Sequence, residues 1–317
     1  MAVYTKLSDD DIAGFLGRYN IGTLASAHGI AEGIENTNYL IATQSSRYIL
    51  TLFEKRVEAK DIPFFLDFTE WLADRDIACP RPIKGRDGNT CYTLAGKPAA
   101  IIQFLEGKGS PNITNYHVEQ LGALMARMHL AAKDFPQERE NSLSLAGWKE
   151  MFASIGKDAD KVMDGLADMI SAELDYLSAS WPKDLPKGVV HADLFPDNVF
   201  FQDEQLSGVI DFYFSCTDFW LYDLMITINA WCFNGVHEFN AARAKTMLQS
   251  YHAIRPITPE ERAAMQVLAR GAALRFLLTR TYDWLNRVEG AIVTTKDPME
   301  YVKKLQFHQK NNPLAPI

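Results

Sequence analysis

Apolar side chains recur every three or four residues through most of the chain after residue 110, a spacing typical of amphipathic helices. An earlier pattern of this kind follows Ser8, where a capping hydroxyl and three acidic residues precede the apolar positions. The predicted helices cover about residues 9–19, 57–75, 114–132, two stretches within 141–181, then 219–233, 237–254, 259–285 and 297–308.

Short runs rich in β-branched and aromatic residues fill the gaps between helices in the first third of the chain. The predicted strands cover residues 22–28, 37–42, 48–53, 90–94 and 99–104. The glycine-rich stretch Glu106–Pro111 then marks a boundary. We therefore expect a two-lobed α+β fold, with an antiparallel sheet and one long helix in residues 1–105 and a mainly helical domain in residues 106–317.

One stretch near the middle of the chain carries the strongest chemical pattern. It reads His191-Ala192-Asp193, then Asn198 five residues after Asp193, then Asp211 between apolar residues. This is the catalytic-loop pattern of kinases, in which the first Asp accepts a hydroxyl proton and the Asn holds a metal ion. The alternative is an ordinary loop followed by a strand-capping Asp211, which the full spacing disfavours.

The spacing between Asn198 and Asp211 has a geometric interpretation. Residues 199–202 and 206–210 read as strands joined by a turn at residues 203–205. A hairpin folded about Glu204-Gln205 would place Asn198 opposite Asp211, about 5 Å apart. Both side chains could then ligate one Mg²⁺ ion through oxygen.

Composition narrows the possible partners. The chain has 317 residues, is 47% hydrophobic and carries a formal charge of −8, which disfavours nucleic acid and anionic membrane surfaces. Its four cysteines form no Cys-x-x-Cys, so a zinc site and a disulfide framework are not expected, and a reducing cytoplasm fits. The polar N-terminus is no signal peptide, and no apolar run approaches about 18 residues.

A nucleotide site is predicted in the first lobe. In a kinase interpretation, residues 29–38 form the loop over the phosphates and supply Gly33, Asn36 and Asn38, although a plain polar hairpin loop would look similar. The connector Gln103-Phe104-Leu105 would offer backbone groups of Gln103 and Leu105 to an adenine edge, unless these residues serve only in edge-strand packing.

The Lys–Glu ion pair of the kinase pattern is missing from this lobe. Thr51 stands at the position of the strand Lys, and the following helix carries Pro63–Leu66 where a Glu is expected. Their joint absence is self-consistent, because the loss of one partner would leave a buried charge uncompensated. Lys55, Arg56, or backbone groups with Mg²⁺ remain candidates for neutralising the phosphates.

Three further polar positions have structural interpretations. His129 is expected to be a core or boundary residue of its helix. Asp218 and Asp223 flank the start of an apolar helix, where acids complement the helix dipole and where they could also support the catalytic loop from below. Arg280 and Asp283 lie three residues apart and could form a simple surface pair.

Together these segments resemble the homoserine kinases of the aminoglycoside-phosphotransferase-like group, which have a protein-kinase-like fold. The resemblance runs through nearly the whole chain and is carried by residues 33–39, 48–54, 103–107, 121–129, 191–198, 275–284 and 296–298. The missing strand Lys is shared with these homoserine kinases. The resemblance implies transfer of phosphate from ATP to L-homoserine, a step of threonine biosynthesis, with ATP and Mg²⁺ as cofactors and Asp193 as base, braced by His191.

Homoserine is a zwitterion, so its pocket needs a cation for the carboxylate and an acid for the ammonium group. The candidates are Tyr213, Arg275, Arg280 and Asp283. A kinase of the same fold for another acceptor, such as an aminoglycoside, choline or a related amino alcohol, remains an alternative. A nucleotide-binding module without catalysis is a further one, although it would have no chemical need for Asp193, Asn198 and Asp211 together.

Overall fold

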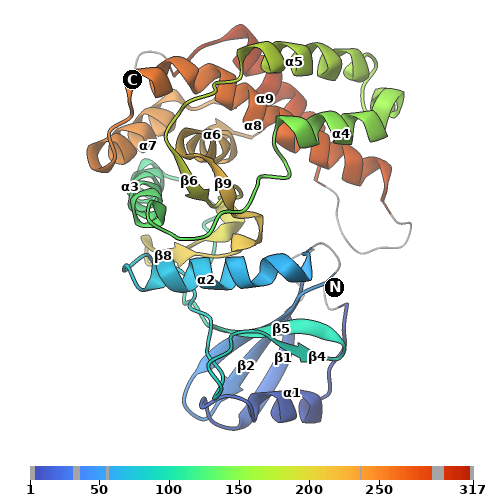
Figure 1. The fold of residues 1–317 in the computed structure, drawn as a ribbon. Coiled ribbons are helices and arrows are strands. Elements are labelled where there is room, and N and C mark those ends of the chain that lie inside the picture. The colour runs from blue at the N-terminus through green and yellow to red at the C-terminus, as the bar shows by residue number, and fades with distance from the viewer. Residues whose placement is uncertain (1–3, 31–35, 55–56, 236–237, 288–295, 315–317) are drawn as a thin grey trace. The chain divides into compact units, whose positions relative to one another are not determined.

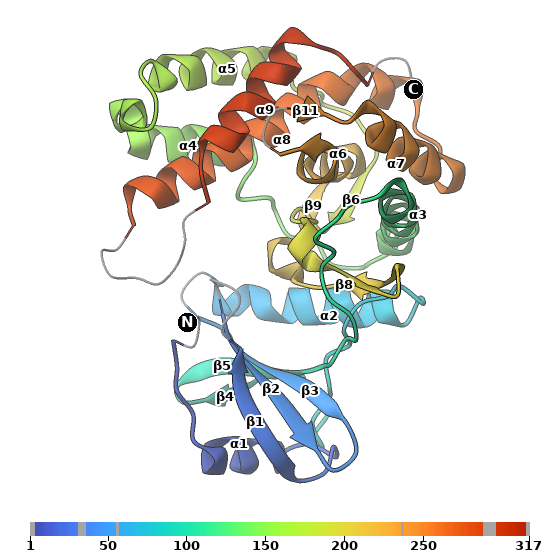
Figure 2. The same ribbon diagram turned by 180° about the vertical axis from the view of Figure 1, so that it is seen from behind.

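The computed structural model describes residues 4–30, 36–54, 57–235, 238–287 and 296–314. The chain divides into two compact units, which Figures 1 and 2 show from opposite sides. Unit 1 holds residues 1–107 together with 207–213, and unit 2 holds residues 108–206 and 214–317. Among the described residues, no helix combines the length and the apolar character needed to cross a membrane.

Unit 1 is built on a five-stranded antiparallel sheet. Its strands run in the order β1-β2-β3-β5-β4, and each neighbouring pair is antiparallel. The strands are β1 (Leu24–Ile30), β2 (Thr37–Thr43), β3 (Arg47–Leu52), β4 (Tyr92–Leu94) and β5 (Lys97–Gln103). The antiparallel sheet predicted for this part of the chain is confirmed.

The two faces of this sheet are covered by different helices. Helix α1 (Asp9–Leu16) begins with the predicted Ser8 cap, which forms a capping box with Asp11, and its buried residues pack with Leu50, Leu52 and their neighbours. Helix α2 (Ile62–Ala73) packs through Ile62 and Leu66 against Phe53. Because side chains alternate along a strand, Leu52 and Phe53 serve opposite faces.

Helix α2 starts later than residue 57, where the sequence pattern placed its beginning. A single 3₁₀ turn, η1 (Ala59–Asp61), precedes it. Pro63 then occupies its first turn, a position that suits proline because the missing N–H would have no helical partner there.

A short segment from late in the chain completes unit 1. The Val209 N–H donates to the Ala78 carbonyl at 2.9 Å, and the Tyr213 ring packs edge-on against Phe53 and Phe65 with centroids at 5.2 and 5.9 Å. These contacts explain why residues 207–213 belong to unit 1. A division of the chain at a single boundary near residue 105 would assign them to the second unit.

Unit 2 is mainly helical, as predicted. Helix α6 (Trp220–Trp231) is its core, with every residue but one buried. In Figures 1 and 2, α3 and α7 lie on one side of α6, and α4 and α5 lie on the other. The remaining helices are α3 (Asn115–Ala132), α4 (Leu145–Ile155), α5 (Leu166–Ser180), α7 (Ala241–Ile254), α8 (Pro259–Leu285) and α9 (Met299–Lys310).

Short strands in unit 2 position the loops. β6 (Lys187–Val190) pairs antiparallel with β9 (Cys216–Phe219), a pair the sequence pattern did not reveal. β7 (Val199–Gln202) and β8 (Gln205–Val209) form the predicted hairpin, but its turn is Asp203-Glu204 and not Glu204-Gln205, because Gln205 already belongs to β8. Asp203 and Glu204 have φ of +47° and +64°, as the tight turn of a two-residue hairpin loop requires. A small pair, β10 (Phe233–Asn234) and β11 (Glu238–Phe239), follows α6.

Candidate active site

The segment after β6 brings three of the predicted site residues of unit 2 together. The Asn198 amide Nδ2 donates to the Asp193 backbone carbonyl at 2.8 Å and to the Asp193 carboxylate at 3.2 Å. The Asp193 N–H donates to Nδ1 of the buried His191 ring at 3.2 Å. Asp193 itself is partly exposed. The loop therefore presents one carboxylate toward solvent while its neighbours hold that carboxylate in place.

A buried carboxylate on α6 supports this loop. Asp223 is fully buried and accepts the backbone N–H groups of His191 at 3.2 Å and Ala192 at 2.7 Å. Burial alone would raise the pKa of Asp223, but the hydrogen bond and charge of His129, the charge of His191 and the Ala192 N–H together hold that pKa below its ordinary value. Asp223 therefore stays ionised where it anchors the loop.

His129 on α3 is buried, as its helical pattern predicted, and it is also part of this support. Its Nε2 lies 3.0 Å from the Asp223 carboxylate and its Nδ1 lies 2.7 Å from the Tyr251 hydroxyl. The sequence pattern gave no sign of these contacts, because they join residues about 90 and 120 positions apart.

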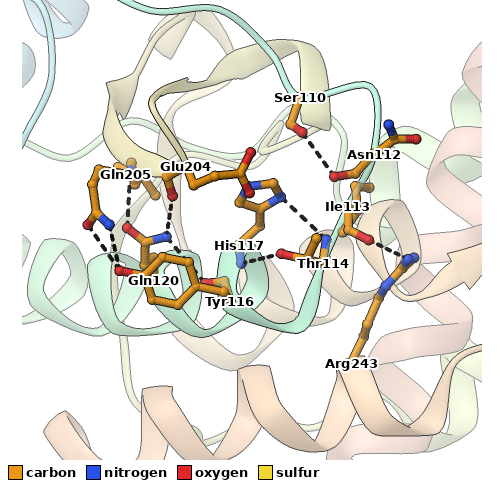
Figure 3. A network of polar contacts seen from close by, with 11 residues as sticks. Ser110, Asn112, Ile113, Thr114, Tyr116, His117, Gln120, Glu204, Gln205 and Arg243 are labelled. Carbon is orange, nitrogen blue, oxygen red and sulfur yellow. Dashed lines mark hydrogen bonds and ion pairs between the residues drawn. The ribbon is translucent and has the colours of Figure 1, made fainter.

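The hairpin that follows the loop is anchored to the start of α3. Figure 3 shows the contacts: Gln120 binds the Glu204 carbonyl and the Leu206 N–H, each at 2.9 Å, and Tyr116 binds Gln205. His117 Nε2 lies 3.0 Å from the Glu204 carboxylate. The hairpin turn is thus fixed by side chains of one helix.

Asp211, the other predicted metal ligand, lies in unit 1, where β8 has ended. Its φ of +65° is a left-handed conformation that non-glycine residues adopt at a cost of about 1–3 kcal/mol, most often at functional sites. The hairpin is present, but it turns one residue earlier than the register that would place Asn198 opposite Asp211. Ligation of one ion by both side chains stays a prediction, because the two residues belong to different units.

The position of the missing strand Lys is filled by a neutral contact. The Thr51 hydroxyl donates to the Asn38 amide oxygen at 2.8 Å. Tyr213 packs beside it on Phe53 and on Phe65, which comes from the middle of α2 where the Glu is absent. Burial raises the pKa of Tyr213, and the negative charge of Asp211 raises it further. Tyr213 is therefore a neutral hydroxyl beside Asp211.

The other candidates for the nucleotide lie at several places in unit 1. Gly33, Lys55 and Arg56 fall outside the described residues. The Asn36 amide oxygen accepts the Glu54 N–H at 3.2 Å, so Asn36 ties the start of β2 to the end of β3. The Gln103 N–H already donates to the Arg81 carbonyl at 2.8 Å. The Leu105 side chain packs close to Gly208.

The acceptor candidates of unit 2 occupy α8, and α9 supplies partners that the sequence reasoning missed. The Arg280 guanidinium donates to Glu300 at 2.6 Å, and Lys304 binds the same carboxylate at 2.6 Å. The buried Tyr301 ring lies under both cations, with Arg280 and Lys304 at 4.5 and 4.7 Å from its centroid. Asp283 is partly exposed one turn further along α8.

The cluster of Arg280, Glu300, Tyr301 and Lys304 lies close to the loop that carries Asp193. Burial raises the pKa of Tyr301, and the negative charge of Asp193 is among the charges that act on it. The Phe276 ring bridges the two regions, since it packs on Tyr301 at 5.2 Å and on Phe195 at 4.9 Å. Two cations share one carboxylate here, so the four residues carry a net positive charge.

A divalent metal ion in this region needs several oxygen ligands. Among the described residues, no group of three or more His, Cys, Asp and Glu side chains could hold a metal by itself. Asn198 directs its Nδ2 at Asp193, which leaves its amide oxygen as the atom able to ligate a cation. Amide and carboxylate oxygens are hard ligands that suit Mg²⁺ when oxygens of phosphate and water complete its coordination. The Asn198 amide oxygen is one ligand of this kind.

Comparison with known proteins identifies the family and the fold. Residues 26–257 match the model of the phosphotransferase enzyme family. The structure is similar to that of an amicoumacin kinase in complex with AMP-PNP and Ca²⁺, with a TM-score of 0.73 at 15% identity over 98% of this chain and 96% of that chain. It is also similar to a choline kinase from Cryptosporidium parvum, with a TM-score of 0.69 at 14% identity over 96% and 95% of the two chains. The predicted kinase-like fold is confirmed, and fold and site together define a phosphotransferase.

Relatives with higher sequence identity show to which group of phosphotransferases the chain belongs. The chain is 54% identical to a homoserine kinase of Paramagnetospirillum magneticum, over 98% of this chain and 97% of that protein. It is also 54% identical to a homoserine kinase of Rhodospirillum rubrum, over 98% and 96% of the two chains. The chain therefore belongs to the homoserine kinases of the phosphotransferase enzyme family, as the resemblance in its sequence indicated.

Proposed function

We propose that this protein transfers the γ-phosphoryl group of ATP to the side-chain hydroxyl of L-homoserine, giving ADP and O-phospho-L-homoserine. The observation that supports this most directly is the loop in which Asn198 holds Asp193 through both its backbone and its carboxylate. An arrangement of this kind orients a base toward a hydroxyl group, and identity of 54% to homoserine kinases over 98% of the chain favours this acceptor.

Asp193 accepts the proton of the acceptor hydroxyl as the new O–P bond forms and the bond to the leaving ADP oxygen breaks. His191 accepts the Asp193 N–H and so braces the base. Because phosphoryl transfer needs little covalent help from the protein, positioning and charge stabilisation carry most of the catalysis.

Asn198 and Asp211 would hold Mg²⁺, which neutralises phosphate charge when it is bound. Asn36, Asn38, Gly33 and the connector residues Gln103 and Leu105 are the proposed contacts to the nucleotide. Among the described residues, Thr51 and Phe65 occupy the positions where the kinase pattern has its phosphate-binding Lys and the Glu that pairs with it. The four cysteines are free, which accords with a reducing compartment such as the cytoplasm.

For the acceptor, Arg280 is the proposed partner of the L-homoserine carboxylate. It belongs to a cluster with surplus positive charge, and Tyr301 of that cluster lies within electrostatic range of Asp193. Asp283 and Tyr213 remain proposed contacts to the amino acid. We expect Arg280→Met to raise KM for L-homoserine about tenfold or more, because a carboxylate would lose a charge-assisted partner. Arg287 is an exposed cation two residues beyond the end of α8, so Arg287→Met is the matched control. An unchanged KM in Arg280→Met would remove Arg280 from the pocket.

The reaction is tested by measuring ADP release from Mg·ATP with L-homoserine, D-homoserine, L-serine, L-threonine, choline and an aminoglycoside as acceptors. Turnover selective for L-homoserine is the expected result. Selective turnover of choline or the aminoglycoside would favour the alternative acceptors. A choline kinase has a structure similar to that of this protein. Binding of Mg·ATP without turnover of any acceptor would favour a non-catalytic nucleotide-binding module.

A further inference from the structure

Arg275 on α8 is unlike the arginines on either side of it. Arg270 binds the Glu173 carboxylate through two hydrogen bonds of 2.7 and 2.6 Å, and Arg280 binds Glu300. Arg275 is only 2% exposed and donates to a backbone group, the Ala192 carbonyl, at 2.5 Å. It also interacts with the Tyr222 hydroxyl and with the charge of Asp218. A buried guanidinium is costly to desolvate, so this placement calls for an explanation.

Ala192 is the residue between His191 and the base Asp193, and its backbone is strained. Its φ is +65°, which for a residue with a Cβ atom is a sparsely populated left-handed conformation. Such a conformation persists only where the surroundings impose it. Two buried side chains do so here: Asp223 accepts the Ala192 N–H at 2.7 Å, and Arg275 donates to the Ala192 carbonyl.

The Ala192 carbonyl and the Asp193 N–H belong to one planar peptide group. Arg275 holds one edge of that plane, and the His191 ring holds the opposite edge by accepting the Asp193 N–H at 3.2 Å. The orientation of this peptide sets the direction in which the Asp193 side chain leaves the backbone. A change at Arg275 would therefore rotate the base without touching it.

We infer that Arg275 is a positioning residue that aims Asp193 at the acceptor hydroxyl, and that it does not read the carboxylate of the acceptor. The hydrogen bond to the Ala192 carbonyl argues for this role, because it fixes the guanidinium on the backbone that carries Asp193. The inference rests on the proposed phosphotransfer, but it concerns how the base is held and not which acceptor is used.

The experiment compares Arg275→Met with the wild type in kcat, in KM, and in L-homoserine affinity measured by titration calorimetry. We expect kcat to fall about 10- to 100-fold, since misplacement of a catalytic group by about 1 Å can cost that much. L-homoserine affinity should change less than about threefold, because a residue that only aims the base does not contribute to binding of the substrate in the ground state. Arg270→Met on the same helix is the control: it removes a buried ion pair and should lower stability while it leaves kcat close to that of the wild type.

Rescue by glycine separates positioning from general damage to the fold. Glycine adopts positive φ without penalty, so the loop should keep its shape without Arg275 once residue 192 is glycine. The fall in kcat from Ala192→Gly to the double variant Ala192→Gly/Arg275→Met should then be smaller than the fall caused by Arg275→Met alone. An equal fall in both backgrounds would overturn the inference.

Two other results would also overturn it: an unchanged kcat, or an L-homoserine affinity lowered tenfold with kcat retained, which would make Arg275 a substrate reader. If Arg275→Met does not fold, Arg275→Gln carries the comparison, because its shorter neutral side chain weakens the contact to the Ala192 carbonyl. Arg275→Lys, which keeps a charged donor, should then retain more of the wild-type kcat than Arg275→Gln. If the wild type fails to phosphorylate L-homoserine, the proposed function fails by itself. The ratio of variant to wild-type kcat is then measured with the acceptor that is used.

Discussion

At the scale of single residues, Asp193 is the side chain on which catalysis should depend most. Asp193→Asn keeps the size and the polar contacts of the side chain but cannot accept the hydroxyl proton. We expect kcat to fall by about two to four orders of magnitude, the range for loss of general-base catalysis, while Mg·ATP affinity and the melting temperature stay close to those of the wild type.

Asp197 provides a matched control for that substitution. It lies in the same loop, is exposed, and pairs only weakly with Lys296 at 3.4 Å. Asp197→Asn should therefore retain kcat. A near-normal kcat in Asp193→Asn, or an equal loss in both variants, would show that Asp193 is not the base.

Substitution of Asp211 is expected to change the affinity for Mg·ATP. If its carboxylate holds Mg²⁺, Asp211→Ala should weaken Mg·ATP binding about tenfold or more and leave binding of metal-free ATP nearly unchanged. Titration calorimetry with and without Mg²⁺ measures both affinities. Equal affinities for Mg·ATP in the variant and the wild type would exclude Asp211 from the metal site.

Residue roles were only partly predictable from the sequence. The local spacing identified His191, Asp193 and Asn198, and these three are in contact in the structure. It did not reveal that α6 and α8 clamp Ala192 or that α9 supplies Glu300 and Lys304 to Arg280. Contacts between residues so distant in sequence depend on how the helices pack, which hydrophobic periodicity does not encode.

At the scale of elements, long periodic helices were the most predictable features. The range predicted for α8, residues 259–285, matches the observed helix, because Pro259 begins it, Thr258 and Glu261 form a capping box, and apolar positions recur throughout. The four-residue strands β6 and β9 were missed, because a strand so short has no clear periodicity of its own and is defined by its partner.

The packing of α3 on α7 gives a prediction that distinguishes two helical glycines. A methyl group at Gly122 of α3 would lie 2.5 Å from the Met247 carbonyl oxygen and would also meet Ser250, whereas one at Gly14 of α1 would meet nothing within 4 Å. Gly122→Ala should therefore destabilise the fold by about 1–3 kcal/mol. Gly14→Ala should be neutral or stabilising by up to about 1 kcal/mol.

Urea unfolding of both variants measures this difference. A Gly122→Ala midpoint at or above that of the wild type would mean that the two helices do not approach each other as closely as described.

At the scale of the whole molecule, a buried histidine makes stability depend on pH. His308 on α9 is buried and bonds the Asn229 amide oxygen at 2.7 Å, and burial lowers its pKa from 6.5 to about 3, with help from the charges of Lys304 and Arg270. The unfolded chain takes up this proton near pH 6.5, but the folded protein does so only near pH 3. Between those values the unfolded state binds more protons, so stability falls as pH is lowered.

We therefore expect His308→Gln to flatten the loss of unfolding free energy between pH 6.5 and 3 by on the order of 1 kcal/mol per pH unit. Thermal unfolding at several pH values, with His28→Gln as an exposed control, measures the slope. A variant and a wild type with parallel curves over this range would show that His308 does not stay neutral in the folded protein.

The return of residues 207–213 to unit 1 has a consequence for how the chain is made. On the ribosome, residues 1–107 emerge before residues 207–213, so the segment that covers Phe53, Phe65 and Phe68 with Phe212 and Tyr213 is synthesised only after residues 108–206. The N-terminal unit thus cannot close its aromatic core during its own translation. Until that segment arrives, three apolar rings stay accessible to chaperones, and a gene truncated after codon 107 would encode a unit that cannot complete itself.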